Sequence, residues 1–535
     1  MSKKKISLFS LIMLTLSSLI GSGWLFGSWE ASKIAGPAAI ISWILGAVII
    51  GLIAFNYIEL GTMFPERGGM SHYAQYTHGS LLGFMAAWAN WISMVTIIPI
   101  EAVASVQYMS TWPWQWANWT RQFMAGDQVS NKGLLVVFLF IIIFTLLNYW
   151  SVNLLTKFTN IISVFKLGVP ILTIILLTIA GFHPSNFGHS LHTFMPYGSA
   201  GIFSATTAAG IIFSYDAFQT VINMGSEIRN PKKNIKRGIV LSLVISFIIY
   251  VALQITFIGV VDPSTIAKVG WHGLNFQSPF ADLAILLGIY WLSVLLYMEA
   301  FISPFGTGVS FVASCARILA AFKENEHFPK IIGKINKKYG IPRVALVVNA
   351  IISIIMVTFF RNWSILASVI STATLIAFLT GPVSVVSLRK MAPDFVRPVK
   401  LKHLDILAPT SFALASLAAY WAMWPTTIEV ILIILIGLPI YFIYEKKRGW
   451  KETRKQIKAS LWLIFYLIML AGLSYIGSTQ FGGIGLIKYP FDFIVLTIFS
   501  LVFYYYGIHS YFKSEYFEQA KQSNKKVDLK EFNEE

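Results

Sequence analysis

The sequence has little charge and almost no cysteine. Asp, Glu, Lys and Arg together make up 12% of the 535 residues, whereas hydrophobic residues make up 56%. A soluble globular protein carries about twice that share of charge, and a soluble domain of this size could not bury so much apolar surface. The single Cys excludes a disulfide framework and a cysteine-based zinc or iron–sulfur site. These absences indicate an integral membrane protein.

Hydrophobic runs take up most of the chain. A bilayer core requires about 20 apolar residues per crossing helix, and 14 segments of this kind can be read from the sequence. They begin near Leu8, Pro37, Leu81, Gly133, Leu155, Gly201, Gly238, Phe280, Ile341, Trp363, Ile406, Thr427, Ser460 and Phe491. The sequence therefore predicts an all-α integral membrane protein with about 14 transmembrane helices and no soluble domain in its loops.

The positions of the basic residues indicate the orientation. When the N-terminus is placed inside, only six of the 41 Lys and Arg residues fall on the outer side. These six are Lys33, Arg121, Lys132, Lys268, Arg361 and Lys488. Basic residues concentrate on the cytoplasmic loops of membrane proteins. The pattern therefore predicts cytoplasmic N- and C-termini, and it assigns the net charge of +17 to membrane orientation rather than to nucleic-acid binding.

Few groups with enzymatic chemistry lie inside the predicted segments. All nine His residues fall in loops or near segment ends, and Cys315 falls near the inner end of the eighth segment. An intramembrane enzyme would need a nucleophile or a metal cluster at mid-depth, and a channel would need charged rings or pore-lining repeats. The sequence therefore predicts neither an enzyme nor a channel, and no metal or other cofactor.

The first segment is interrupted at mid-depth by Ile20-Gly21-Ser22-Gly23. Each Gly weakens a helix by about 1 kcal/mol relative to Ala, and backbone groups freed inside a membrane must find protein, water or solute partners. Small residues also let membrane helices pack closely. Taken alone, this motif is equally consistent with close packing and with solute binding.

The sixth segment is interrupted as well, near Phe213-Ser214-Tyr215-Asp216-Ala217. An Asp in the middle of a membrane costs about 2.5 to 3.5 kcal/mol on insertion scales and is a functional candidate by default. Segments one and six hold corresponding places in two successive runs of five. Broken helices at matching places predict a transporter built from inverted repeats, with the solute bound where the half-helix ends meet.

Four motifs in a fixed order carry a family resemblance. They are Ile20 to Phe26 at the first break, Glu59 to Gly69 after the second segment, Glu227 to Ile235 after the sixth, and Phe328 to Lys330 with Asn336 to Pro342 before the ninth. Together they resemble the amino acid-polyamine-organocation permeases, and the chain is most similar to their bacterial aspartate-proton symporter branch.

The resemblance implies a leucine-transporter fold, with a 5+5 inverted repeat and broken helices one and six. The expected domain organisation follows from it. Core helices one to ten cover 1–345 and 346–400, with repeats of about 8–181 and 200–390. Helices eleven and twelve cover 401–445, an extra pair covers 446–510, and 511–535 is expected to be a mobile, polar cytoplasmic tail.

An amino acid needs donors for its carboxylate and acceptors for its ammonium group. The second half of helix one starts near Gly23 with free N–H groups and a positive dipole end, so Ser22 and the amides of Gly21 and Gly23 are expected to hold the carboxylate. The family pattern implies that freed carbonyls of Leu19, Phe213 and Asp216 take the ammonium group. The expected solute-binding set is Leu19, Ile20, Gly21, Ser22, Gly23, Phe213, Ser214, Tyr215, Asp216 and Ala217. For the Phe213 ring, a gate over the solute and ordinary packing both stay open.

Three ionisable residues inside segments are candidates for proton coupling. Lys166 matches a Lys that, in proton-coupled family members, takes the place of a sodium ion, and a desolvated ammonium group can lose its proton. Glu101 is expected either to pair with Lys166 or to stand alone. Glu299 is either a proton carrier or a packed, protonated acid, and the sequence does not separate these two roles.

The sequence thus predicts a secondary active transporter of the bacterial cytoplasmic membrane. It is expected to import an acidic amino acid, aspartate or glutamate, with protons by alternating access. Its expected partners are the solute, protons and the lipid bilayer. A neutral or cationic amino acid permease, an exchanger and a non-transporting nutrient receptor stay open as alternatives. Gln219 stands where exchangers of the family carry an acid, which disfavours exchange by their mechanism.

Overall fold

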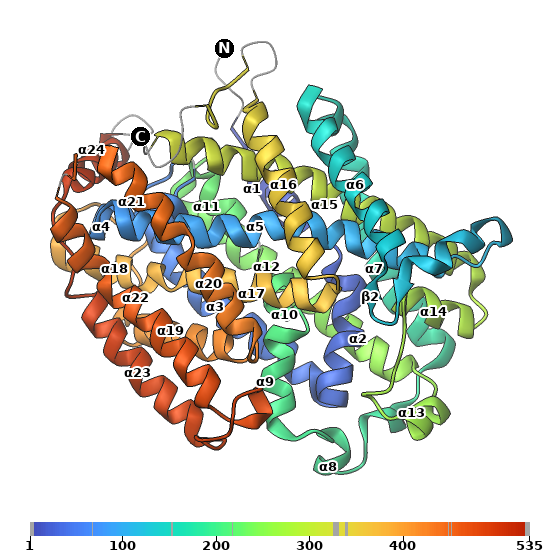
Figure 1. The fold of residues 1–535 in the computed structure, drawn as a ribbon. Helices are drawn as coiled ribbons and strands as arrows, with labels where there is room; N and C mark the ends of the chain where they lie inside the picture. The colour runs from blue at the N-terminus through green and yellow to red at the C-terminus, as the bar shows by residue number, and fades with distance from the viewer. Residues whose placement is uncertain are drawn as a thin grey trace.

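The chain folds into an α-helical bundle with one wholly buried helix at its centre. The computed structural model describes residues 5–529 except 67, 151–152, 217, 325–330, 337–340, 448 and 451. Helix α5 (Ser80–Met109) is buried along all of its 30 residues and packs against α15 (Tyr290–Glu324) and α17 (Trp363–Phe378) (Figure 1). Because every side of α5 is buried, it is the scaffold around which the other helices pack.

The predicted segments one to five fall on seven helices and one 3-10 turn. These are α1 (Leu8–Leu19), α2 (Gly23–Ala35), η1 (Gly36–Ala38), α3 (Ala39–Met63), α4 (Met70–His78), α5, α6 (Asn131–Trp150) and α7 (Asn153–Gly181). The connections on one side carry η2 (Gln115–Phe123), the antiparallel pair β1 (Met124–Ala125) and β2 (Gln128–Val129), η3 (Pro184–Phe187) and α8 (Leu191–Phe194).

Segments six to ten follow, with the sixth in three short pieces. They comprise α9 (Gly198–Ala208), α10 (Ile211–Tyr215), α11 (Phe218–Asn223), η4 (Gly225–Glu227), α12 (Pro231–Val260), α13 (Pro263–Val269), α14 (Pro279–Leu286), α15, α16 (Arg343–Phe359), α17 and α18 (Thr380–Met391). The C-terminal part comprises α19 (Leu404–Tyr420), α20 (Thr426–Leu435), α21 (Gly437–Lys447), α22 (Thr453–Ile476), η5 (Thr479–Phe481), α23 (Phe491–Gly507) and α24 (Glu515–Leu529).

Eight helical runs in the described part of the chain are long and apolar enough to cross a bilayer unaided. They are Gly23–Met63, Ser80–Met109, Asn131–Tyr149, Pro231–Val260, Tyr290–Ala320, Trp363–Met391, Thr426–Lys447 and Thr453–Ile476. Of the other six predicted segments, the fifth lies on the 29-residue helix α7. The remaining five lie on shorter helices, because α1 and α9 end at breaks and α16, α19 and α23 each end after 17 residues. The predicted all-α membrane architecture is confirmed, with helices one and six broken.

The eighth segment starts later than predicted. Phe280 lies on α14, a separate eight-residue helix, where its ring stacks on Trp24 with the centroids 5.7 Å apart. The helix ends because Gly288 adopts a φ of 74°, a left-handed conformation that suits glycine and stops a helix. The crossing helix α15 begins only at Tyr290.

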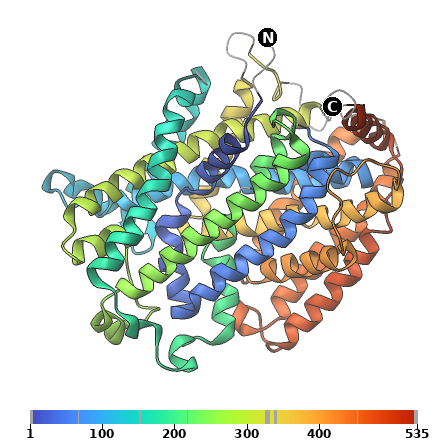
Figure 2. The same cartoon turned by 180° about the vertical axis from the view of Figure 1, so that it is seen from behind.

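Both ends of the described chain meet one face of the bundle. The N–H of Ile6 donates to the Glu227 carbonyl at 2.8 Å, and the N–H of Arg229 donates to the Ile6 carbonyl at 2.9 Å. Helix α24 packs against α4 on this terminal face, whereas α8 and α13 lie on the opposite side (Figure 1). Figure 2 shows the same separation from behind. Residues 515–529 therefore form a docked helix, where the sequence had suggested a mobile tail.

Candidate solute-binding site

The break in the first helix leaves several carbonyl groups without helical partners. Helix α1 ends at Leu19 and α2 begins at Gly23. Side chains of three other helices donate to the freed carbonyls. Tyr250 of α12 donates to Leu19 at 3.1 Å, Ser303 of α15 donates to Ile20 at 2.9 Å, and Lys166 of α7 donates to Ser17 at 2.9 Å. Buried backbone groups need partners, and these bonds supply one to each of the three carbonyls.

A carboxylate of the protein occupies the donor side of the same break. The N–H of Ser22 donates to both carboxylate oxygens of Glu101, at 3.1 and 3.0 Å. The indole N–H of Trp363 donates to the Ser22 hydroxyl oxygen at 2.9 Å. All three side chains are buried, with 2% or less of their surface exposed. The Ser22 amide, predicted to bind the carboxylate of a solute, therefore holds the carboxylate of Glu101 in this structure.

The two glycines of the motif are required by close approach. A Cβ atom on Gly21 would overlap the Glu101 carboxylate and would lie 3.3 Å from the Thr307 methyl group. A Cβ atom on Gly23 would lie 2.5 Å from the Ser214 hydroxyl oxygen. Gly21 thus makes room for the bound carboxylate, whereas Gly23 lets the two broken helices cross in contact.

The sixth helix is interrupted twice rather than once. Helix α9 ends at Ala208, and Gly210 then adopts a left-handed φ of 76° before the five-residue helix α10 begins. A second turn at Asp216 separates α10 from α11. The Phe213 N–H donates to the hydroxyl oxygen of Ser371 on α17 at 3.2 Å. Ala217, predicted to belong to the site, lies outside the described residues.

Asp216 is buried and only partly hydrogen-bonded. Its Oδ2 atom accepts from Thr374 at 2.8 Å and from Gln219 at 3.2 Å. Its Oδ1 atom has no hydrogen-bond partner among the described residues. The neighbouring Tyr215 ring packs edge-on against Trp43 at 5.7 Å and against Tyr250 at 5.5 Å. The Tyr215 hydroxyl has no described partner either, so Asp216 differs from it in offering a carboxylate oxygen rather than a neutral hydroxyl.

Aromatic rings cover the break on the side from which α2 continues. The Trp363 ring lies 5.1 Å from Phe26 and 6.4 Å from Phe213, measured between centroids. Phe213 also reaches Gly23, since its ring would lie 3.7 Å from a Cβ atom there. The Phe213 ring therefore packs against Trp363 beside the first break. This position is consistent both with a gate over the solute and with ordinary packing.

Lys166 of α7 also reaches the break. Its ammonium group donates to the Ser17 carbonyl at 2.9 Å and to the Thr307 hydroxyl at 2.5 Å. It lies within Coulombic range of Glu101 and Glu299 but forms no ion pair within 4.0 Å with any described carboxylate. Lys166 and Glu101 therefore flank the same turn of helix one without direct pairing. Glu299 is buried with no hydrogen bond to either oxygen among described residues.

Four residues that hold the breaks are not among those predicted from the sequence. Trp363, Ser371 and Thr374 lie on α17 and reach both broken helices, and Tyr250 on α12 caps Leu19. Each lies far from the breaks in sequence. The one available signal is the spacing of the three α17 residues, which places them along one face of a helix.

Two broken helices that meet at a buried carboxylate, within a bundle of membrane-crossing helices, define a membrane transporter of the leucine-transporter fold. The family model for amino acid permeases matches residues 6–453, and the chain belongs to this family. The protein is therefore a multi-pass membrane protein and an amino acid permease, not an enzyme. The resemblance indicated by the four sequence motifs is confirmed.

Relatives align over nearly the whole chain. It is 49% identical over 526 residues to the glutamate/serine transporter AimA of Bacillus subtilis, which covers 98% of this chain and 97% of the relative. It is 36% identical over 510 residues to the aspartate-proton symporter of the same organism, covering 94% and 96%. The branched-chain amino acid permease BcaP of B. subtilis is 23% identical over 472 residues, covering 84% and 94%.

Proposed function

We propose that this permease imports an acidic amino acid, glutamate or aspartate, together with protons across the bacterial cytoplasmic membrane. The observation that carries the proposal is the docking of the Glu101 carboxylate on the Ser22 amide. The break is thereby suited to an anion of the kind that every amino acid carries. The names of the two Bacillus relatives above 30% identity support an acidic solute.

The solute carboxylate takes the place of Glu101 in this proposal. Helix α2 has 13 residues, and the first N–H groups of a helix have no intrahelical partner and carry a partial positive charge. A carboxylate is stabilised there. The Oδ1 atom of Asp216 is the acceptor proposed for the ammonium group, because it is buried and has no described partner.

Proton coupling follows from the competition between two carboxylates. If a solute carboxylate arrives while Glu101 is charged, two negative groups face one buried amide, and one of them must take up a proton. Protonated Glu101 gives up the Ser22 amide to the solute and enters the occluded state as the proton carrier. Lys166, within Coulombic range of Glu101, offsets negative charge that stays in the site.

Alternating access then moves both species inward. The proposed orientation has the N- and C-termini in the cytoplasm, as the distribution of Lys and Arg predicts. The pairing of Ile6 with Ile228 and the docking of α24 on the same face support a common side for both ends. Glu299, one helical turn before Ser303, is the alternative proton carrier to Glu101.

The test is uptake of labelled glutamate and aspartate into proteoliposomes under an inward proton gradient. We expect the labelled amino acid to accumulate inside the proteoliposomes, and we expect a protonophore to abolish this accumulation. Uptake that requires preloaded internal amino acid would indicate an exchanger, and binding without uptake would indicate a nutrient receptor. Either result would overturn the proposal. Unlabelled serine is added as a competitor, because the relative with 49% identity is named for glutamate and serine.

A further inference from the structure

Trp363 is the first residue of α17, and its indole N–H donates to the Ser22 hydroxyl oxygen at 2.9 Å. We propose that Trp363 is a positioning residue that fixes the direction of the Ser22 hydroxyl, so that this hydroxyl faces the solute as a hydrogen-bond donor and selects carboxylates. This inference rests on the proposed function, because it concerns how the same site recognises its solute.

The chemistry of the two groups gives the bond its direction. An indole N–H only donates, whereas a hydroxyl carries one hydrogen and two acceptor lone pairs. The Ser22 oxygen accepts from Trp363, which leaves the Ser22 hydrogen to turn toward the bound anion. The backbone N–H of the same residue already points at the Glu101 carboxylate. Two donors from one residue then converge on one carboxylate.

The indole is held rigidly enough to impose this direction. Asn362 caps α17, accepting from the Ser364 N–H at 2.7 Å, and its amide donates to the Asp127 carbonyl at 2.8 Å. The Trp363 ring packs between Phe26 and Phe213. At Gly210 a Cβ atom would lie 3.1 Å from the ring, so glycine permits the close packing on the remaining side.

Burial alone does not require a hydrogen bond for an indole in this chain. Trp24 and Trp462 are buried to 1% and 0% exposure, and neither indole nitrogen has a hydrogen-bond partner among the described residues. The bond from Trp363 to Ser22 is thus not a general consequence of burying tryptophan. It joins α17 to the first break at the residue that holds the carboxylate.

The test is Trp363→Phe, which keeps a packed ring and removes the donor. Removal of one oriented hydrogen bond is expected to raise the KM for glutamate and aspartate about five- to tenfold with kcat within about twofold. Discrimination against the solute's α-carboxamide analogue should also fall, because a freely turning hydroxyl can accept from an amide. Trp462→Phe on α22 is the matched control and should change neither quantity.

A double-mutant cycle tests whether Trp363 acts on the solute through Ser22. Ser22→Ala is expected to produce the same rise in KM, and adding Trp363→Phe to it should change nothing further if Trp363 acts through Ser22. Additive losses would overturn the positioning role, as would an unchanged KM in Trp363→Phe. Failure of the wild-type protein to take up acidic amino acids would instead contradict the proposed function itself.

A second inference comes independently from the terminal face. We infer that α24 is a strap that holds this face closed. The Asn524 side chain accepts from the Val396 N–H at 2.8 Å and donates to the carbonyls of Val396 and Met63 at 3.0 and 3.4 Å. Ser523 donates to the Glu66 carboxylate, and Phe517 stacks on Phe395 at 5.7 Å.

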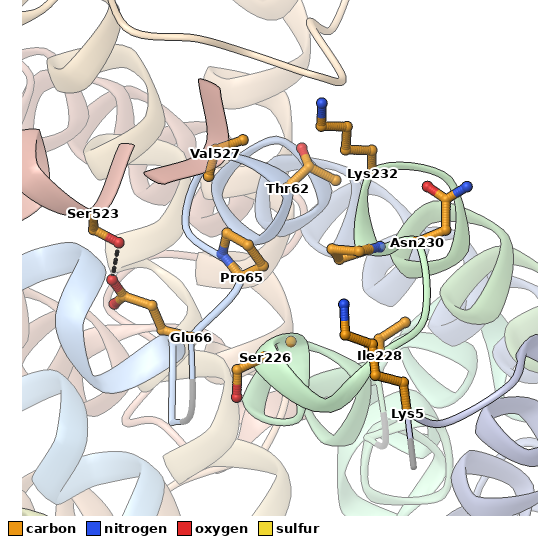
Figure 3. A pocket seen from close by; sticks show the side chains of 12 residues that line it. Lys5, Thr62, Pro65, Glu66, Ser226, Ile228, Asn230, Lys232, Ser523 and Val527 are labelled. Atoms are coloured by element: carbon orange, nitrogen blue, oxygen red, sulfur yellow. Dashed lines mark hydrogen bonds between the residues drawn. The ribbon is translucent and has the colours of Figure 1, made fainter. Parts of the chain in front are cut away.

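These contacts join the exit of α3 to the loop between α18 and α19. Behind them lies a cavity of about 190 Å³, lined by residues of α24, the α3 exit, the N-terminal segment and the loop that precedes α12 (Figure 3). The chain segments next to both broken helices border this cavity. Opening toward this face that moves the α3 exit away from the loop between α18 and α19 breaks the contacts of α24.

The strap is tested by the accessibility of a new cysteine at Thr62, which lines the cavity and is 1% exposed. The native Cys315 is buried, so the background reaction with an impermeant maleimide is low. In Thr62→Cys protein, Asn524→Ala or deletion of 515–535 is expected to speed labelling from the terminal face severalfold. Gln522→Ala, an exposed position on the same helix, should not. Equal labelling in all four proteins would overturn the inference.

Discussion

Replacement of Gly23 by Ala is expected to push apart the two broken helices where they cross. The new Cβ atom would lie 2.5 Å from the Ser214 hydroxyl oxygen, well inside the 3.4 Å of ordinary contact. Ser214 cannot turn away freely, because its hydroxyl donates to the Gly210 carbonyl at 2.9 Å. Overpacking of this kind costs about 1 to 3 kcal/mol, which lowers solute affinity about five- to 150-fold where the strain falls on the solute-bound state.

The assay is the thermal shift that glutamate and aspartate produce in detergent, since a solute that binds only the folded state raises its stability, followed by uptake in proteoliposomes. The double variant Gly23→Ala with Ser214→Ala should recover affinity, because the Ser214 Cβ atom would lie at 3.4 Å. Gly472→Ala on α22 is the control, with no atom within 4 Å of its new Cβ. Full affinity in Gly23→Ala, or no recovery in the double variant, would refute the reasoning.

Three further predictions concern coupling and stability. Lys166→Ala removes the cation that offsets negative charge beside Glu101 and is expected to lose accumulation driven by a pH gradient while solute exchange persists; accumulation at the wild-type level would contradict this role of Lys166. Glu59→Gln leaves Arg389 and Arg397 beside a neutral amide and should lower the stability in a thermal unfolding assay by about 3 to 5 kcal/mol; an unchanged Tm would contradict this. Import of aspartate with one proton moves no net charge, so a valinomycin-set potential, negative inside, should leave its uptake rate unchanged. Clear acceleration would mean at least two protons per solute.

The parts of the fold that sequence analysis predicted depend on local signals. Apolar runs of helix length mark the membrane segments, and the pair Gly21 and Gly23 marks the first break within a few residues. The start of the eighth segment was misplaced because α14 is as apolar as α15, and only the conformation of Gly288 separates them. Helix α24 was overlooked because its overall composition is polar, although Phe517, Ala520 and Asn524 fall on one helical face and are buried.

The contacts within the site could not be predicted, because they join residues far apart in sequence. Ser22 and Glu101 are separated by 79 positions, and Ser22 and Trp363 by 341. Their meeting depends on how α5 and α17 pack against the break. The family resemblance offers Lys166 as a partner for Glu101, whereas the packing turns the Glu101 carboxylate to the Ser22 amide. Lys166 finds its partners in a carbonyl and a hydroxyl instead.

The exchange of Glu101 for the solute carboxylate at the Ser22 amide is tested most directly by counting protons at equilibrium. Isothermal titration of the purified protein with glutamate, in buffers of different ionisation enthalpy, gives the number of protons taken up on binding. The wild-type protein and Glu299→Gln should each take up about one proton per solute near neutral pH, if one of two facing carboxylates must be neutral. Glu101→Gln should bind glutamate and take up none. Equal proton uptake in wild type and Glu101→Gln would contradict the account.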